Sequence, residues 1–307
     1  MAKTIGFLHS GSKSNHSNNY LAFERGLAEA GYVDDDDINI KELWADDDLT
    51  TLQTNAAKFV NPPIGPVDVI VAAGGPRSAA EAKNATPTIP IVFTVVSDPV
   101  RNSLIQSYEN PGYNLTGTAG LTSELDPKRL EILKELLPNA STIGVLKNPI
   151  RPTGTAEYQD LTTAATKLGL TLVPKDAKSL AEIQNAFTGG GAFPPTIDAI
   201  LVTADQLFNN QRRKLVKLVR QFGKPAIYQW RDFVDVRGLM SYGPSITDAY
   251  FKAGIYVGRV LDGGTPANMP VMFPDKFELV INLKTAHHQS VTVPVSLLTR
   301  AILVRKP

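Results

Sequence analysis

The chain repeats one pattern of strand and helix in its two halves. Residues 3–31 combine an apolar run, a polar loop and an amphipathic stretch that ends at Gly31. The same order returns in residues 141–169, where the amphipathic stretch ends at Gly169. Such a repeat predicts two similar α/β lobes facing each other across a cleft, and clefts are where proteins bind small ligands.

The repeat extends to later segments of each half. The run Asp68–Gly75 resembles Asp198–Asp205, and Ile89–Thr94 resembles Lys224–Gln229. Continuous Ile- and Val-rich runs of this kind suit strands buried on both faces of a parallel sheet. They fall near residues 4–9, 38–44, 68–73, 90–95, 142–147, 170–174, 198–203, 225–229 and 238–242. Amphipathic helical patterns alternate with them, so the predicted fold class is α/β, with two doubly wound parallel-sheet lobes.

Turn-rich segments mark where the chain passes between lobes. Asn110–Gly117 is the predicted first crossover and Ser241–Pro244 the second. We therefore expect residues 1–119 plus about 244–268 in the first lobe, and 120–243 plus about 269–307 in the second. A hinge of several strands permits closure of the lobes and restrains twisting.

Composition excludes several classes of function. The 307 residues carry a formal net charge of +1, with Lys and Arg along the whole chain, so we expect no nucleic-acid partner and no direct membrane binding. The absence of cysteine excludes thiol catalysis, thiolate metal sites and disulfides. No apolar run reaches the length of roughly 18 residues that a membrane-spanning helix needs.

Ligands of open parallel sheets lie beyond the carboxyl ends of the strands. Reading off those ends gives the predicted ligand-binding residues: Ser10, Gly11, Gly74, Gly75, Thr94, Ser97, Asp98, Asn148, Asp205, Tyr228, Gln229 and Tyr242. Ser10 and Gly75 would also expose backbone N–H groups at helix starts, which favour a carboxylate. Helix capping explains any single Ser or Thr of this set equally well.

The chemistry of these residue types suits a small aromatic ligand. Tyr228, Trp230 and Tyr242 could stack on a flat ring, although Trp230 and Tyr242 could equally pack inside the second lobe. Candidate partners of an ammonium group are Asp98 and Asp205, and those of a carboxylate are Arg77 and Arg151. Asp98 could instead cap a following helix.

Motifs for catalysis, metals and cofactors are missing. The chain has no phosphate loop, no dinucleotide fingerprint and no nucleophile elbow. The acidic run Asp46–Asp48 lacks calcium-loop spacing, and the adjacent His287 and His288 have no further ligand at metal spacing. We therefore predict no catalytic residue, no metal site and no cofactor.

Ordered motifs over almost the whole chain resemble a known family. They are Val67–Gly75, Ala85–Phe93, Ser97–Val100, Pro111–Gly117, Lys128–Glu135, Val280–Ala286 and Val293–Ala301. Together they resemble ABC-transporter substrate-binding proteins related to tryptophan and tyrosine importers. Asn102, Tyr113 and the stretch His287–Gln289 depart from the family's usual residues. The resemblance implies a type I periplasmic-binding-protein fold, a small-molecule ligand, and a permease and ATPase as partners.

On this basis we expect a monomeric, extracytoplasmic solute-binding protein that closes around a small molecule, such as an aromatic amino acid or a related aromatic compound. We expect it to reach the membrane only through its transporter. The unprocessed protein would then carry a secretory signal ahead of Lys3. Two alternatives stay open. One is a ligand-sensing regulatory module of the same fold, and the other is a two-lobed glycosyltransferase-like enzyme.

Overall fold

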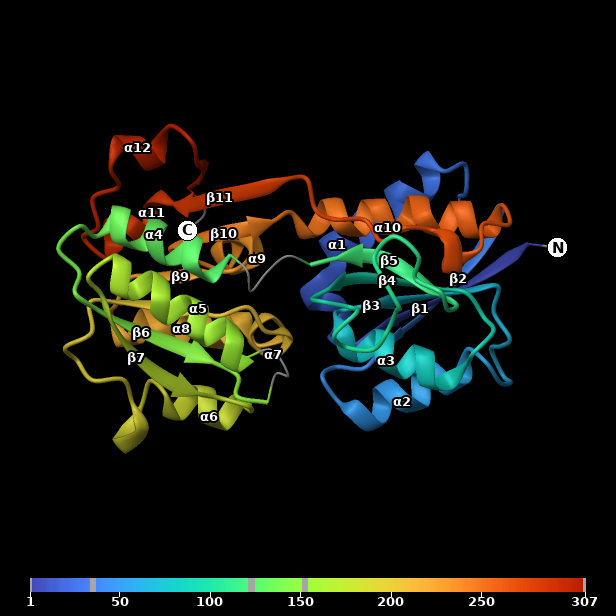
Figure 1. Ribbon diagram of the computed structural model, residues 1–307, viewed down its shortest axis with the longest axis horizontal. Helices are drawn as coiled ribbons and strands as arrows, with labels where there is room; N and C mark the ends of the chain where they lie inside the picture. The colour runs from blue at the N-terminus through green and yellow to red at the C-terminus, as the bar shows by residue number, and fades with distance from the viewer. Residues whose placement is uncertain (1, 34–36, 121–124, 151–153, 306–307) are drawn as a thin grey trace. The chain divides into compact units, whose positions relative to one another are not determined.

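The computed structural model describes residues 2–33, 37–120, 125–150 and 154–305. The chain divides into two compact units, coloured in Figure 1 by position along the sequence. The first unit comprises residues 1–121 and 245–276, and the second comprises residues 122–244 and 277–307. Both units are therefore discontinuous, and three chain segments connect them.

The first unit is a five-stranded parallel sheet with helices on both faces (Figure 1). The strand order is β2-β1-β3-β4-β5. The strands are β1 (Lys3–His9), β2 (Ile38–Trp44), β3 (Val69–Ala73), β4 (Ile91–Val96) and β5 (Leu115–Ala119). The helices are α1 (Lys13–Glu29), α2 (Leu49–Lys58), α3 (Pro76–Ala85), α10 (Ile246–Leu261) and the 3-10 turn η2 (Pro266–Asn268). Helices α2 and α3 pack together on one face, and α1 and α10 on the other.

The second unit is a seven-stranded sheet of order β12-β11-β10-β9-β8-β6-β7. Its strands are β6 (Thr142–Lys147), β7 (Thr171–Asp176), β8 (Ala199–Val202), β9 (Ala226–Tyr228), β10 (Met240–Pro244), β11 (Phe277–Asn282) and β12 (Ile302–Val304). Only the β10–β11 pair is antiparallel among the described strands. The helices are α4 (Asp126–Leu136), α5 (Gly154–Lys167), α6 (Leu180–Asn185), η1 (Gly189–Gly191), α7 (Gln206–Asn210), α8 (Arg212–Phe222), α9 (Arg231–Asp235), α11 (Leu283–His288) and α12 (Val295–Leu298).

The strand orders confirm the fold class predicted from the repeat. The order β2-β1-β3-β4-β5 has the same form as β7-β6-β8-β9-β10, with β11 and β12 added at one edge of the second sheet. Strands β3 and β8 are buried along their whole length, as expected for central strands covered by helices on both faces.

The two halves also share a polar contact that joins neighbouring strands. In the first unit, the backbone N–H of Thr4 donates to Asp68 Oδ2 at 2.7 Å. In the second unit, the N–H groups of Ser141 and Thr142 donate to Asp198 Oδ2 at 2.7 and 2.9 Å. The repeat seen in the sequence is thus present in the hydrogen bonds as well as in the topology.

The second predicted crossover, Ser241–Pro244, ends at the boundary between the units, whereas the first crossover differs in place from the sequence expectation. Asn110–Gly117 contains the start of β5 and lies inside the first unit, which continues to Leu121. Residues 269–276, expected in the second lobe, lie in the first unit. The reason is that this segment bonds along β5, where the N–H of Ala119 donates to the carbonyl of Met272 at 2.8 Å.

Helix α10 is held in the first unit by close contact with α1. A Cβ on Gly254 would collide with the carbonyl oxygen of Phe23, and a Cβ on Gly26 would collide with that of Phe251. Two glycines thus let the helix backbones approach each other. Within the described ranges, no helix has the length and hydrophobicity that a membrane crossing requires.

Candidate functional site

In the first unit, the ends of β1 and β3 are tied together. The hydroxyl of Ser10, directly after β1, donates to the carbonyl of Gly74 at 2.9 Å. Gly74 and Gly75 follow β3 with φ angles of +85° and +95°, and Gly75 is the residue that precedes the first turn of α3. A Cβ on Gly74 would lie 2.6 Å from Ser10 Oγ, so this tight turn requires glycine at that position.

Two hydroxyls at the same sheet edge are buried without a hydrogen-bond partner. Thr94 lies near the end of β4, and Ser78 lies in the first turn of α3. Neither the Oγ1 of Thr94 nor the Oγ of Ser78 has a partner, although both residues are fully buried. Buried polar groups are nearly always paired in folded proteins, so these two hydroxyls are candidates for a ligand contact. Ser78 was not predicted; its position three residues after Gly75, at a helix start, is the available signal.

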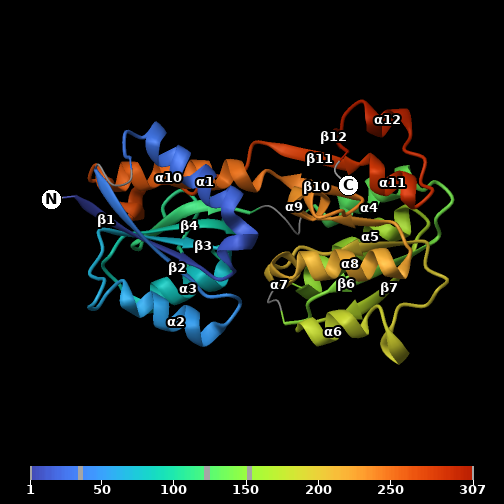
Figure 2. The same ribbon diagram turned by 180° about the vertical axis from the view of Figure 1, so that it is seen from behind.

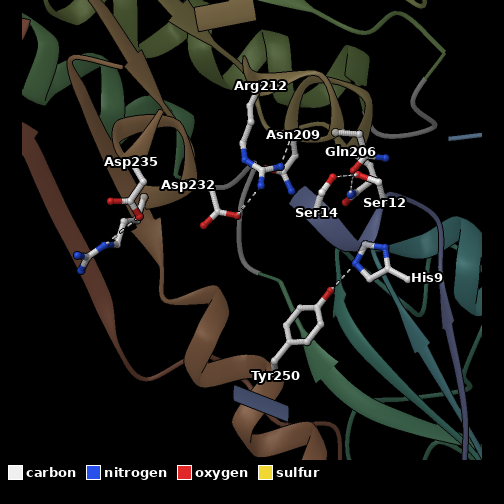
Figure 3. A network of polar contacts seen from close by, with 11 residues as sticks. His9, Ser12, Ser14, Gln206, Asn209, Arg212, Asp232, Asp235 and Tyr250 are labelled. Carbon is white, nitrogen blue, oxygen red and sulfur yellow. Dashed lines mark hydrogen bonds and ion pairs between the residues drawn. The ribbon is translucent and has the colours of Figure 1, made fainter. Parts of the chain in front are cut away.

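Gly11, in the loop that follows β1, forms a hydrogen bond with the last residue of that strand. Its backbone N–H donates to Nδ1 of His9 at 2.9 Å, and Nε2 of His9 lies 3.1 Å from the hydroxyl of Tyr250 on α10 (Figure 3). The His9 ring is buried and stacks on Trp44 at a centroid distance of 4.6 Å. His16 lies against the same ring, at 4.4 Å. This cluster fixes the loop that joins β1 to α1.

Ser97 and Asp98 belong to a turn that follows β4. Asp98 has a φ angle of +41°, and its Oδ1 accepts the N–H of Arg101 at 2.9 Å and the hydroxyl of Tyr108 at 3.3 Å. The carbonyl of Ser97 accepts the amide of Asn102 at 2.8 Å. No described helix begins here, so Asp98 stabilises a turn where the sequence suggested a helix cap.

In the second unit, two predicted residues cap the local backbone. Oδ1 of Asn148, just beyond β6, accepts the N–H of Ile150 at 3.2 Å. Asp205 precedes α7, and its Oδ1 accepts the N–H of Leu207 at 2.8 Å. Asp205 therefore caps the start of α7, and Asn148 stabilises the turn that follows β6.

Tyr228 and Tyr242 contact the interior of the second unit. The Tyr228 ring is fully buried and stacks on Phe233 at 4.8 Å with an interplanar angle of 12°. Burial raises the pKa of the Tyr228 phenol above its ordinary value. The half-buried Tyr242 packs against the hydrophobic core, and its carbonyl accepts Nε of the buried Arg129 at 2.6 Å. Packing thus accounts for the Tyr228 ring.

Gln229 is the predicted residue that most needs a ligand. Its side chain directly follows β9 and is 0% exposed, yet neither its Oε1 nor its Nε2 has a hydrogen-bond partner. The neighbouring Trp230 has a buried indole N–H without a hydrogen-bond partner. Ser241 lies on the adjacent strand β10, and its buried hydroxyl also has no hydrogen-bond partner. The amide and the indole N–H directly after β9, and the hydroxyl on β10, are therefore buried donors and acceptors that a ligand could use.

A charged group near the start of α8 was not predicted. Arg212 is buried, its Nη1 donates to the carbonyl of Asn209 at 2.9 Å, and its Nη2 lies 3.9 Å from Asp232 (Figure 3). Arg212 occupies the same helix face as the buried Leu215 and Val219. The sequence signal for a buried arginine is a cation at a helix position where the apolar periodicity requires a buried residue.

Of the two predicted carboxylate partners, Arg77 lies exposed in α3, and Arg151 lies outside the described residues. Within the described ranges, no group of three or more His, Cys, Asp or Glu side chains could hold a metal ion.

Comparison with known proteins gives consistent matches over most of the chain. Residues 12–305 match the family model described as ABC transporter substrate binding protein. A protein of Clostridioides difficile named tyrosine-binding protein is 33% identical over 263 residues, which are 86% of this chain and 74% of that protein.

Solved structures show the same fold. A conserved domain protein from Vibrio cholerae has a TM-score of 0.87 and 25% identity, covering 99% of both chains. An ABC domain from Streptococcus pneumonia, solved in complex with L-Trp, has a TM-score of 0.85 and 26% identity, covering 99% of this chain and 100% of that one.

Proposed function

Because this chain belongs to the family of ABC transporter substrate-binding proteins, we propose that it binds an aromatic amino acid such as L-tyrosine or L-tryptophan. The observation that carries the proposal is the group of buried, unpartnered polar atoms of Gln229, Trp230 and Ser241. The names of two relatives support the ligand class, since one is a tyrosine-binding protein and the other was solved with L-Trp.

The proposed ligand contacts follow from the chemistry of the strand ends. An amino acid presents a carboxylate, an ammonium group and a side chain. The start of α3, with Gly75 and the unpartnered hydroxyl of Ser78, suits the carboxylate because backbone N–H groups at a helix N-terminus favour an anion. The Gln229 amide can accept from the ammonium group through Oε1 and donate through Nε2.

In this proposal the protein delivers its ligand unchanged. The matched family is that of ABC transporter substrate-binding proteins, and such proteins work outside the cytoplasmic membrane with an ABC transporter. We propose that this chain acts as a monomer, passes its ligand to a permease and ATPase, and is made with a secretory signal.

Calorimetric titration with L-tyrosine, L-tryptophan and L-leucine tests the proposal, after unfolding and refolding to remove any ligand carried through purification. We expect the aromatic amino acids to bind and Gln229→Leu to weaken that binding at least tenfold, the effect of losing about 1.4 kcal/mol. The same variant should keep or gain stability, since leucine removes an unpaired buried amide.

Gln221→Leu is the matched control, because Gln221 is exposed on α8. It should leave the affinity unchanged. Absence of heat and of any thermal shift with all aromatic amino acids would contradict the proposed ligand class. Tight binding that survives Gln229→Leu would contradict the assigned site.

A further inference from the structure

The near-neutral chain is built from two units of opposite charge. The first unit holds 11 Lys and Arg against 17 Asp and Glu, a formal charge of −6. The second holds 20 Lys and Arg against 13 Asp and Glu, a formal charge of +7. The overall charge of +1 therefore conceals a strongly basic unit, which a whole-chain average cannot reveal.

Much of that positive charge lies on one helix. No Asp or Glu occurs between Asp205 and Asp232, whereas this interval contains seven Lys and Arg residues. Helix α8 buries Leu215, Val216 and Val219 in the interior of the second unit. Its opposite side forms a basic face, which we define as the exposed residues Arg213, Lys214, Lys217 and Arg220.

The carboxylates on the neighbouring helices α6 and α9 interact with groups outside the basic face. Asp232 and Asp235, on α9, face Arg212 and Arg231. Glu182, on α6, accepts the backbone N–H of Lys178 at 3.0 Å. No described carboxylate forms an ion pair with Lys214, Lys217 or Arg220. Figure 2 shows α8 on the outer side of its unit, with α6 beside it.

We propose that the basic face of α8 binds the anionic phospholipid surface of a membrane. The face presents these cations along about two turns of helix, or roughly 11 Å. A lipid surface offers many phosphates without fixed geometry, which suits mobile Lys and Arg side chains. The exposed residues of α8 include no aromatic ring for base stacking, so the face favours lipid over single-stranded nucleic acid.

This contact goes beyond solute binding. It would hold the second unit at the membrane, where the transporter lies, independently of whether a ligand is bound. The proposal differs from the expectation, drawn from the even charge of the whole chain, that the membrane is reached only through the transporter.

Vesicle flotation with the purified full chain tests the proposal. We expect the protein to float with vesicles of phosphatidylcholine and phosphatidylglycerol in equal parts at about 0.02 M salt, and not with phosphatidylcholine alone. Binding should disappear at about 0.5 M salt, because screening shortens the range of the attraction. The triple variant Lys214→Gln, Lys217→Gln, Arg220→Gln should bind about 100-fold more weakly, since each cation near such a surface contributes about a factor of five.

A second triple variant controls for net charge alone. Lys167→Gln, Lys178→Gln, Lys284→Gln removes three exposed cations of the same unit, which lie in α5, in the loop before α6 and in α11. It should retain most of the binding. Circular dichroism and L-tyrosine titration should be unchanged in both variants, which separates this inference from the proposed ligand site. The proposed lipid contact would be overturned if both triple variants lost vesicle binding equally, or if the wild type did not float with anionic vesicles.

Discussion

Aspartates near strand ends stabilise this protein through backbone N–H groups. Asp98 is one of them, in a left-handed conformation that asparagine tolerates better than alanine does. We expect Asp98→Ala to lower the free energy of unfolding by about 1 kcal/mol, because the N–H of Arg101 and the hydroxyl of Tyr108 lose their acceptor. Chemical denaturation measures the change, and ligand affinity should stay the same.

Asp98→Asn is the control for that prediction. It keeps an acceptor oxygen and a residue type suited to positive φ, so it should lose less stability than the alanine variant. A tenfold loss of ligand affinity in Asp98→Ala, with stability preserved, would assign the carboxylate to the ligand instead.

Asp198 makes a pH-dependent contribution to the free energy of unfolding. The N–H groups of Ser141 and then Thr142 lower the pKa of Asp198 below its ordinary value. Since the folded pKa lies below the unfolded value of about 3.9, the contribution is fully present above that pH and is lost as the pH falls through the folded pKa. Asp198→Asn should therefore be less stable than wild type at pH 7, and the difference should shrink below about pH 4. A difference that stays constant from neutral to acid pH would contradict this assignment.

At the scale of elements, the contact of α1 with α10 depends on glycine. Gly254→Ala should destabilise the protein by about 2 kcal/mol, because the new methyl group would collide with the backbone carbonyl of Phe23. Gly190→Ala is the control, since no atom lies within 4 Å of a Cβ at that position. Thermal unfolding of the two variants measures the difference. Equal melting temperatures would show that the helices can move apart at little cost.

The same scale shows why sequence patterns predicted some elements and missed others. Strands such as β3 and β8 are buried runs of Val, Ile, Leu and Ala, so composition reveals them directly. Strand β5 reads Leu-Thr-Gly-Thr-Ala after a turn-rich stretch, and its first three residues fall in the predicted crossover Asn110–Gly117. Its Gly117 is required because a Cβ there would collide with the carbonyl of Phe93, a contact between strands far apart in sequence.

For the candidate site, the topology predicted where the site residues lie better than it predicted what each side chain does. The carboxyl ends of the strands follow from their order, so Ser10, Thr94 and Gln229 could be placed there from sequence. Which side chains are already occupied depends on tertiary contacts. Tyr228 stacks on Phe233, a packing that no spacing rule indicates.

At the scale of the whole molecule, the predicted closure around a ligand can be measured in solution. Small-angle X-ray scattering should give a smaller radius of gyration with saturating L-tyrosine than without it, because ligand binding favours the closed state. Gln229→Leu at the same ligand concentration should keep the ligand-free value. Unchanged scattering of a wild-type protein shown by calorimetry to be saturated would contradict closure.

The discontinuity of the first unit also affects how the chain folds during synthesis. Residues 1–121 leave the ribosome without α10, which begins at Ile246. At about 5–20 residues per second, the missing helix follows roughly 6–25 s later. Throughout that interval the side of α1 that α10 will cover is open to other chains and to chaperones. The glycine-lined contact therefore forms late in the completion of the first unit, and a newborn chain is prone to aggregate before α10 emerges.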